Sequence, residues 1–295
     1  MKKTVSTVLL LLFSSTLLLS ACSGENTITV GAQTYSETKT IGFMYKELIE
    51  ANTDLSVNVK TDMSTDTVIL KAMMNDEVDI ATSYTGTALT SFFSMKYPKD
   101  RDATLKQTKN DFADEYNIKV LDPLGFANTY AIGVTQEFSE KNNINAISDL
   151  KDIAGDLTFV SDTSWMGRKE DGYKAFTKLY GFKFGETKQV NNLQYKALKN
   201  NEADAGLVYS TDARIDSYNL TTLNDNKNFF PPYDAVPFVR QETLDNHPEI
   251  KEVFSSLIGK LDLDTIRKLN HQVDVEGEDP HDVAVDFLKK QDMLN

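Results

Sequence analysis

The chain has 295 residues, of which 40% are hydrophobic and 25% are charged. This balance is typical of a globular protein with room for roughly two domains, and it excludes a disordered chain and a membrane protein with several spans. The formal net charge of −13 argues against nucleic acid and against an anionic membrane surface as partners. A single cysteine excludes a disulfide framework within the chain and a zinc site of several cysteines.

Residues 1–21 are typical of a signal peptide. Two lysines precede an apolar run over residues 5–19, which serine and threonine interrupt and which is shorter than a membrane span of about 20 residues. The run ends in Leu-Ser-Ala-Cys (19–22), which resembles the lipobox of bacterial lipoproteins, where cleavage leaves Cys22 as the lipidated first residue. We therefore expect residues 22–26 to form a lipidated tether. A secreted protein with a stray thiol is the alternative.

Strands and helices alternate over the first half of the remaining chain. The segments with strand character are 27–32, 55–60, 78–81, 118–121 and 130–135. Apolar residues at helical spacing predict helices over 36–49, with Ser36 as N-cap, and over 65–74 and 103–116. This alternation predicts a mostly parallel sheet with helices on its faces.

The same pattern then starts again. The expected elements are helices at 144–152, 172–180 and 192–200 and strands at 157–160 and 205–208. Beyond the Pro-Pro pair at 231–232 the pattern predicts helices at 244–246, 248–261, 265–269 and 281–288. Two alternating blocks predict two α/β lobes.

An internal repeat supports the two lobes. Residues 71–88 and 196–213 align at a constant offset and share a helix end, an Asn/acidic turn, a buried strand and a tyrosine at the end of that strand. Ligands of open α/β sheets bind at the carboxyl ends of strands, so Tyr84 and Tyr209 would reach one cleft from opposite sides if the lobes face one another. The alternative is two similar units whose tyrosines only cover their own sheets.

Sequence motifs for catalysis are absent. The chain lacks the short signatures of hydrolases, phosphate-binding loops, dinucleotide-binding folds and zinc proteases. His247, His271 and His281 lie beside predicted helix ends, where solvated side chains are more usual than ligands, and the acidic cluster around Gly277 lacks the order of a calcium loop. We expect no enzyme activity, no cofactor and no metal site.

Several tyrosines stand beside turn residues and outside the apolar periodicity, namely Tyr84, Tyr130, Tyr209 and Tyr233. Rings at strand edges can present their faces to a cleft, and several of them can enclose a quaternary ammonium. Such a cation has no N–H to donate to a carboxylate, so cation–π attraction and apolar contact with its methyl groups would hold it. Taken singly, each tyrosine fits a core or rim position equally well.

Six segments together resemble the osmoprotectant-binding lipoproteins of bacterial ABC importers. They are GAQTYSET (31–38), SYTGTALT (83–90), LGFANTYAIGVT (124–135), SWMGRKEDGY (164–173), VYSTDARI (208–215) and FFPPYD (229–234). The resemblance runs from about Thr27 to Leu288. It implies a type II periplasmic-binding-protein fold, which is α/β with two lobes, two crossover segments and an interlobe cleft that closes on a ligand.

The resemblance also implies a function and a site. Glycine betaine, carnitine and choline are the expected small-molecule ligands, and the permease subunits of the importer are the expected partner. Tyr84, Tyr130, Tyr209 and Tyr233 match the cage tyrosines, and Gln33 and Thr87 match polar positions at the other end of the ligand.

The crossover segments are expected near Asn128 and near residues 231–235. Lobe 1 would then comprise residues 27–127 and 235–295, and lobe 2 residues 128–234. The protein is expected outside the cytoplasm, held by its lipid on the outer face of the bacterial cytoplasmic membrane.

The sequence departs from the family pattern around Tyr84. Ser83 and Ala88 stand where relatives often have Arg and Asp, which suggests a lost charge pair on that loop. At Thr87 some relatives carry an acid, which would attract a bare cation such as choline and repel the carboxylate of a betaine. The neutral Thr87 predicts a broad range of ligands that includes glycine betaine and carnitine.

Three residues of the SWMGRKEDGY segment have two possible roles, one in the pocket and one in the structure. Trp165 would form a wall of the pocket or pack against Phe182 or Phe184. Arg168 or Lys169 would hold a ligand carboxylate or form a structural salt bridge. Two other functions also stay open from the residues alone, which are a lipoprotein that binds an amino acid or another small cation and a lipid-anchored hydrolase.

Overall fold

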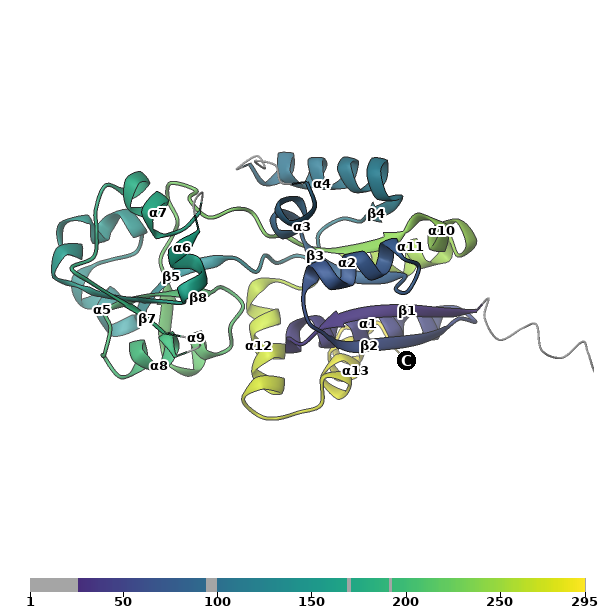
Figure 1. Cartoon of the computed structure of the whole chain (residues 1–295). Coiled ribbons are helices and arrows are strands. Elements are labelled where there is room, and N and C mark those ends of the chain that lie inside the picture. Colours follow the sequence, from purple (N-terminus) through teal and green to yellow (C-terminus); the bar gives the residue numbers. More distant parts are fainter. Residues whose placement is uncertain (1–25, 94–99, 169–170, 191–192, 295) are drawn as a thin grey trace, which may run out of the picture.

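The computed structural model describes residues 26–93, 100–168, 171–190 and 193–294. Within this part of the chain the strands form two five-stranded sheets, and we name the body around each sheet lobe 1 and lobe 2 (Figure 1). The expected signal peptide, the lipobox with Cys22, and Lys169 lie outside the described residues. No helix in the described ranges combines the length and the apolar character needed to cross a membrane.

The sheet of lobe 1 has the strand order β2-β1-β3-β10-β4. Its strands are β1 (Thr27–Gln33), β2 (Ser56–Met63), β3 (Ile80–Tyr84), β4 (Ile118–Val120) and β10 (Ala235–Arg240). β1 pairs in parallel with β2 and β3, whereas β10 runs antiparallel to both β3 and β4. Four of the five strands therefore run in one direction, as the alternation of elements predicts, and β10 makes the sheet mixed because it enters when the chain returns from lobe 2.

The sheet of lobe 2 repeats this plan with the order β7-β6-β8-β5-β9. Its strands are β5 (Tyr130–Thr135), β6 (Thr158–Ser161), β7 (Glu186–Gln189), β8 (Ala205–Tyr209) and β9 (Leu220–Thr222). β6 is parallel to β7 and β8, and β5 is antiparallel to β8 and β9. The internal repeat thus supplies β3 and β8, which hold the central position in their sheets.

Two crossover segments join the lobes side by side. The chain leaves lobe 1 between β4 and β5 and returns between β9 and β10. An antiparallel bridge pairs Ala127 with Asp234, and the Asn128 N–H donates to the Tyr233 carbonyl over 3.1 Å. Because these segments are bonded to each other, they form one paired hinge between the lobes.

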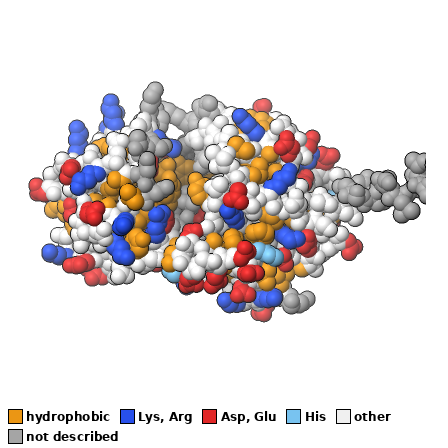
Figure 2. Space-filling view, turned by 60° about the horizontal axis from the view of Figure 1, so that its bottom comes forward, with side chains coloured by type: hydrophobic (Ala, Val, Ile, Leu, Met, Phe, Trp, Pro, Cys, Tyr) orange, Lys and Arg blue, Asp and Glu red, His pale blue; other side chains and the backbone are white. Residues whose placement is uncertain are grey.

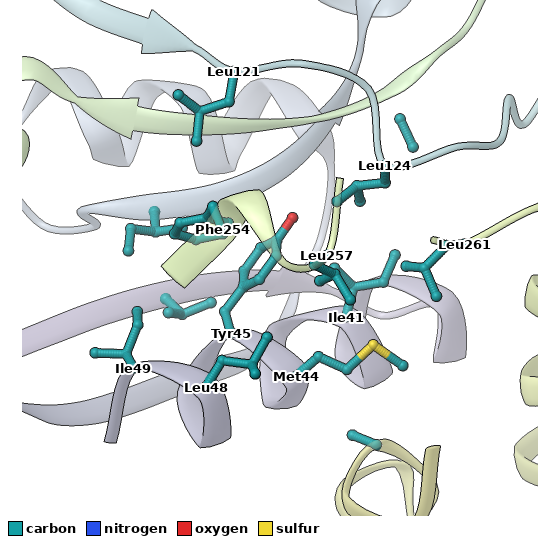
Figure 3. Close-up of a cluster of buried hydrophobic side chains, with 14 of the residues drawn as sticks. Ile41, Met44, Tyr45, Leu48, Ile49, Leu121, Leu124, Phe254, Leu257 and Leu261 are labelled. Atoms are coloured by element: carbon teal, nitrogen blue, oxygen red, sulfur yellow. The ribbon is translucent and has the colours of Figure 1, made fainter. Parts of the chain in front are cut away.

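Helix α1 (Ser36–Asn52) carries the core of lobe 1. Its buried face packs against the C-terminal helices α11 (Glu249–Ser255), α12 (Leu263–Asp274) and α13 (Pro280–Lys290). Figure 3 shows Met44, Tyr45 and Leu48 pointing into a cluster with Phe254 and Leu257. Full burial of an apolar side chain contributes about 1.5–3 kcal/mol, so this helix is firmly fixed.

The start of α1 differs by one residue from the expectation. Tyr35 holds the N-cap position and makes no side-chain cap, so the prediction of Ser36 as N-cap is wrong. Ser36 is the first helical residue, and its hydroxyl donates to Asp274 of α12 instead.

The remaining helices are divided between the two lobes. In lobe 1 they are α2 (Asp66–Met74), α3 (Thr85–Phe92), α4 (Arg101–Tyr116) and α10 (Gln241–Asn246). In lobe 2 they are α5 (Gln136–Asn142), α6 (Thr163–Gly167), α7 (Tyr173–Tyr180), α8 (Gln194–Lys199) and α9 (Arg214–Ser217), with 3-10 turns at Ile147–Asp152 and Ala154–Asp156.

Candidate ligand-binding site

A cavity of about 890 Å³ lies between the two lobes. It is lined by the carboxyl ends of β1, β3 and β8, by the first turns of α1, α2 and α3, by the hinge, and by the end of α12. Carboxyl ends of parallel strands are where open α/β sheets bind ligands, because the loops there are free to carry polar side chains. Both lobes contribute to one shared cavity at that position.

All six residues predicted to bind the ligand line this cavity. Tyr84 ends β3, Tyr209 ends β8 and Tyr130 begins β5. Tyr233 belongs to the returning hinge segment, Gln33 ends β1, and Thr87 lies in the first turn of α3. Their contact with a ligand stays a prediction.

Three of the four rings lie close together. The Tyr130 ring centroid is 5.1 Å from that of Tyr209 at an interplanar angle of 37°, and 6.4 Å from that of Tyr233 at 82°. In the antiparallel ladder Tyr130 is the direct partner of Tyr209. Pairing between β5 and β8 therefore fixes two rings of lobe 2 side by side, and the hinge places the Tyr233 ring edge-on to that of Tyr130.

Gly86 permits the approach of α3 to the hinge. A Cβ built at this position would lie 2.7 Å from the Pro232 carbonyl oxygen and 3.1 Å from the Tyr233 ring. Real Cβ atoms do not approach a backbone oxygen that closely, so a larger residue would displace Tyr233. The glycine of the Tyr-Thr-Gly-Thr segment thus sets the position of a ring that lines the cavity.

Glu37 is a buried acid of the cavity that the sequence did not single out. Its side chain is 4% exposed and accepts hydrogen bonds from the Tyr84 hydroxyl, from Asn128 Nδ2 over 3.2 Å and from Asn270 Nδ2 over 3.2 Å. Burial raises the pKa of Glu37, and the hydrogen bonds from Tyr84, Thr211, Asn270 and Asn128 oppose that rise. Burial and then the adjacent Glu37 charge raise the pKa of the Tyr84 phenol.

Asp66 is a second acid on the lobe 1 wall. It accepts from Gln33 Nε2 over 3.3 Å and from the Ser83 hydroxyl over 2.9 Å. Burial raises the pKa of Asp66 to about 7. Ser83, expected on a loop with Ala88, lies instead inside β3, and Ala88 lies in α3. Ser83, which stands where relatives often have a charged residue, therefore serves as a hydrogen-bond donor to Asp66.

The lobe 2 wall carries arginines that have their own acidic partners. Arg168 Nε donates to Asp171 Oδ1 over 2.7 Å, and Arg168 Nη2 donates to Asp171 Oδ2 over 2.5 Å. Arg214 pairs with Asp212 over 2.6 Å. Arg168 lines the cavity, and its guanidinium carbon lies 5.7 Å from the Tyr130 centroid. It thus forms the structural salt bridge that the sequence allowed and also faces the cavity.

Trp165 belongs to the core of lobe 2. Its side chain is 0% exposed, and its ring lies 6.0 Å from Phe159 and 6.0 Å from Phe176, centroid to centroid. Of the two roles left open for Trp165, packing is the one that the structure supports, although the ring partners differ from those expected.

Among the described residues, no cluster of three or more His, Cys, Asp or Glu is arranged to hold a metal ion. His247, His271 and His281 do not line the cavity, and each pairs with a glutamate of lobe 1. Figure 2 shows acidic and basic side chains interspersed on the face in view, without a continuous basic surface.

Comparisons with known proteins agree with this architecture. Residues 26–290 match the family model described as the substrate binding domain of ABC-type glycine betaine transport system. A carnitine transport binding protein of Listeria monocytogenes is 40% identical over 98% of this chain and 97% of its own length. A glycine-betaine-binding protein of Pseudomonas aeruginosa is 30% identical over 93% of this chain and 94% of its own length.

A solved structure shares the fold closely. The crystal structure titled as a glycine betaine/carnitine/choline ABC transporter superposes with a TM-score of 0.88 at 36% identity, covering 91% of this chain and 100% of that chain. The two-lobe α/β fold with two crossover segments and an interlobe cleft is thereby confirmed, and so is a role in binding and not in catalysis. The chain belongs to the family of substrate-binding domains of ABC-type glycine betaine transport systems.

Proposed function

We propose that the interlobe cavity captures a quaternary-ammonium osmoprotectant, such as glycine betaine, carnitine or choline, and that the protein delivers it to an ABC permease. The observation that carries this proposal is the meeting of four tyrosines from both lobes and the hinge at one cavity. The Tyr130 ring centroid lies 5.1 Å from that of Tyr209 and 6.4 Å from that of Tyr233, so the three rings are close enough to contact one methylated nitrogen together. The relatives named for carnitine and glycine betaine support the same ligand class.

The chemistry of such a ligand suits these rings. A trimethylated nitrogen carries a permanent charge without an N–H, so a carboxylate gains no hydrogen bond from it, whereas a ring face offers both cation–π attraction and apolar contact. Each ring contributes about 0.5–2 kcal/mol. Gln33 and Thr87 would hold the opposite end of the ligand through its carboxylate or hydroxyl.

Lobe closure would complete the site. Tyr209 is 38% exposed, whereas Tyr84 and Tyr233 are 9% and 6% exposed. A hinge motion at the paired crossover segments, near residues 127–129 and 231–235, would bury Tyr209 against the ligand and strengthen each attraction by removing water. We place the boundary between the lobes within these two segments.

A lipid anchor would keep the protein beside its permease. The Leu-Ser-Ala-Cys segment at 19–22 supports cleavage before Cys22 and attachment of acyl chains there. Each buried CH₂ contributes about 0.8 kcal/mol, so two or more chains hold a protein on a bilayer stably. Radiolabelled palmitate should enter the wild-type protein made in bacteria and should be absent from Cys22→Ser.

Calorimetric titration of the soluble mature chain with glycine betaine, carnitine, choline and free glycine tests the ligand class. We expect the trimethylated ligands to bind with a Kd on the order of micromolar, about −8 kcal/mol. Free glycine should bind at least about 100-fold more weakly, because its ammonium needs hydrogen-bond acceptors that rings do not provide. Equal affinity for glycine and glycine betaine would favour an amino-acid-binding protein and overturn the cage.

A further inference from the structure

We propose that Glu37 is the buried counter-charge of the cation site, which attracts the ligand's ammonium through space while its hydrogen bond holds the Tyr84 ring. This inference deepens the proposed function and rests on it. It assigns a role to an acid that lines the cavity, is 4% exposed and belongs to no ion pair among the described residues.

Every partner that the described chain gives Glu37 is neutral. The partners are a phenol (Tyr84), a threonine hydroxyl (Thr211) and two amides (Asn128 and Asn270). Burying a carboxylate without a cation is costly, and proteins usually pair such a group. A negative charge that only neutral donors contact in the cavity can therefore pair with the positive charge of a bound ligand.

The local structure opposes the effect of burial, which raises the pKa of Glu37, by stabilising the charged form of the side chain. Glu37 lies in the first turn of α1, where the helix dipole favours a negative charge. Asn128 and Asn270 both turn their Nδ2 donors toward it, while their Oδ1 atoms are buried without a partner among the described residues. Asn128 donates to Glu37 Oε1 and Asn270 donates to Glu37 Oε2, so both oxygens of the side chain accept, as they do in the carboxylate form.

The charge is close enough to act on the ligand. A cation over the Tyr84 ring sits within about 6 Å of its centroid, and Glu37 lies one hydrogen bond beyond the phenol oxygen, so the two charges are about 7 Å apart. At an effective dielectric constant of about 20, a unit charge at that distance changes a binding constant on the order of 50-fold, and water in the open cavity reduces this. The contact also draws electron density into the Tyr84 phenol, which strengthens the negative ring face.

Glu37 also joins the two lobes. Thr211 of lobe 2 bonds its carboxylate, and Asn270 Nδ2 donates both to Glu37 over 3.2 Å and to the Thr211 carbonyl over 2.9 Å. The counter-charge therefore lies on the hinge side of the cavity, where both lobes contact it.

The test compares Glu37→Gln with wild type on two ligands of the same shape. Choline carries the charge, and 3,3-dimethylbutan-1-ol replaces its nitrogen by carbon. We expect Glu37→Gln to weaken choline binding about tenfold or more and to change binding of the neutral alcohol less than about twofold. Titration followed by fluorescence or by NMR line shifts reaches the millimolar affinity expected for the alcohol.

Two further variants separate the effect of the Glu37 charge from that of its side-chain shape and from that of the protein's net charge. Glu37→Asp keeps the charge with a shorter side chain and should recover most of the lost choline affinity. Asp54→Asn removes the same charge from an exposed loop beyond the far end of α1 and should leave both ligands unaffected. Circular dichroism and thermal melts of each variant establish that it is folded before titration.

The outcomes are distinct. Wild-type protein that binds neither choline nor glycine betaine contradicts the proposed function itself. If the wild-type protein binds choline and Glu37→Gln loses affinity for choline and for the neutral alcohol equally, the counter-charge is overturned and Glu37 is only a structural support of Tyr84. The same conclusion follows if Glu37→Asp recovers none of the lost choline affinity. Unchanged choline affinity in Glu37→Gln overturns it as well.

Discussion

Tyr84 and Tyr209 end equivalent strands in the two lobes, yet their surroundings differ. Tyr84 is 9% exposed and its hydroxyl donates to the buried Glu37. Tyr209 is 38% exposed, and its backbone N–H donates to the Tyr195 hydroxyl over 2.9 Å. Lobe 1 therefore holds its ring inside its core, whereas lobe 2 holds its ring against Tyr130 and leaves it partly exposed at the cavity.

The walls of the cavity differ in charge as well as in burial. Lobe 1 contributes two buried acids, Glu37 and Asp66, while lobe 2 contributes Arg168 and Arg214, each neutralised by an aspartate of its own lobe. The same strand plan thus supports an acidic, preformed half of the site and a neutral half. We conclude that the duplicated sheet supplies the frame and that the surrounding helices decide the chemistry.

The largest expected contrast comes from removing each ring. Tyr84→Ala should lower the free energy of unfolding by about 3–5 kcal/mol, because it empties a buried position and removes one of the hydrogen-bond donors to Glu37. Tyr209→Ala should lower it by less than about 1 kcal/mol, since half-exposed side chains contribute little to stability. Urea denaturation measures both, and equal losses would contradict the division into a fixed and an exposed half. Calorimetry should show weaker glycine betaine binding in each variant.

A medium effect is expected at Gly86, which stands where lobe 2 has Thr211. Gly86→Ala places a Cβ 2.7 Å from the Pro232 carbonyl oxygen, so we expect a loss of about 1–3 kcal/mol in stability together with weaker ligand binding. Gly155→Ala in lobe 2 is the matched control, because a Cβ there meets nothing within 4 Å. If both variants melt at the wild-type temperature and bind equally well, the hinge is less tightly packed against α3 than we infer.

The third effect concerns pH and is spread over several pH units. Burial raises the pKa of Asp66 from 3.8 to about 7, so between these values the folded protein keeps a proton that the unfolded chain has lost, and stability falls as pH rises toward 7. Asp66→Asn cannot titrate, so its stability relative to wild type should improve over this interval by at most about 1.4 kcal/mol per pH unit.

Asp149 in lobe 2 provides a control of opposite sign. Hydrogen bonds from the Asn145 and Ala146 backbone lower the pKa of Asp149, so its contribution to stability is present above its ordinary pKa and is lost as pH falls. Asp149→Asn should therefore lose stability relative to wild type as pH rises through the acid range. Parallel pH profiles for the two variants would show that Asp66 is not the buried, protonated acid inferred here.

Much of the fold follows from local pattern. The strand at 130–135 has its predicted bounds, and α1, α4 and α7 lie within a few residues of the predictions. The sequence did not reveal β10, because Pro237 stands in it and proline rarely occupies an inner strand. β10 tolerates this proline between β3 and β4, and its carbonyl still accepts from the Leu121 N–H over 2.9 Å. Short strands such as β7 and β9 carry too few residues to show a period.

The cavity residues divide in a similar way. The tyrosines could be identified because they break the apolar periodicity at strand ends. Glu37 and Asp66 were missed, although each carried a detectable signal. Glu37 lies on the buried stripe of α1, four residues before Ile41, and Asp66 lies on that of α2, three residues before Ile69. An acidic residue on the apolar face of a helix is rarely buried unless it has a partner, so its position indicates a structural or functional role. Asn270 gave no such signal, because its role depends on where α12 meets the hinge.

The place of β10 has a consequence for how the chain acquires its shape during synthesis. Lobe 2 takes all its strands from residues 130–222, one uninterrupted stretch, whereas the lobe 1 sheet needs residues 235–240 to join β3 to β4. A growing chain can thus finish the second lobe first, while the earlier-made strands wait with an open edge. We expect a chain truncated before residue 235 to aggregate through that edge. Lobe 1 would then complete its folding only after lobe 2.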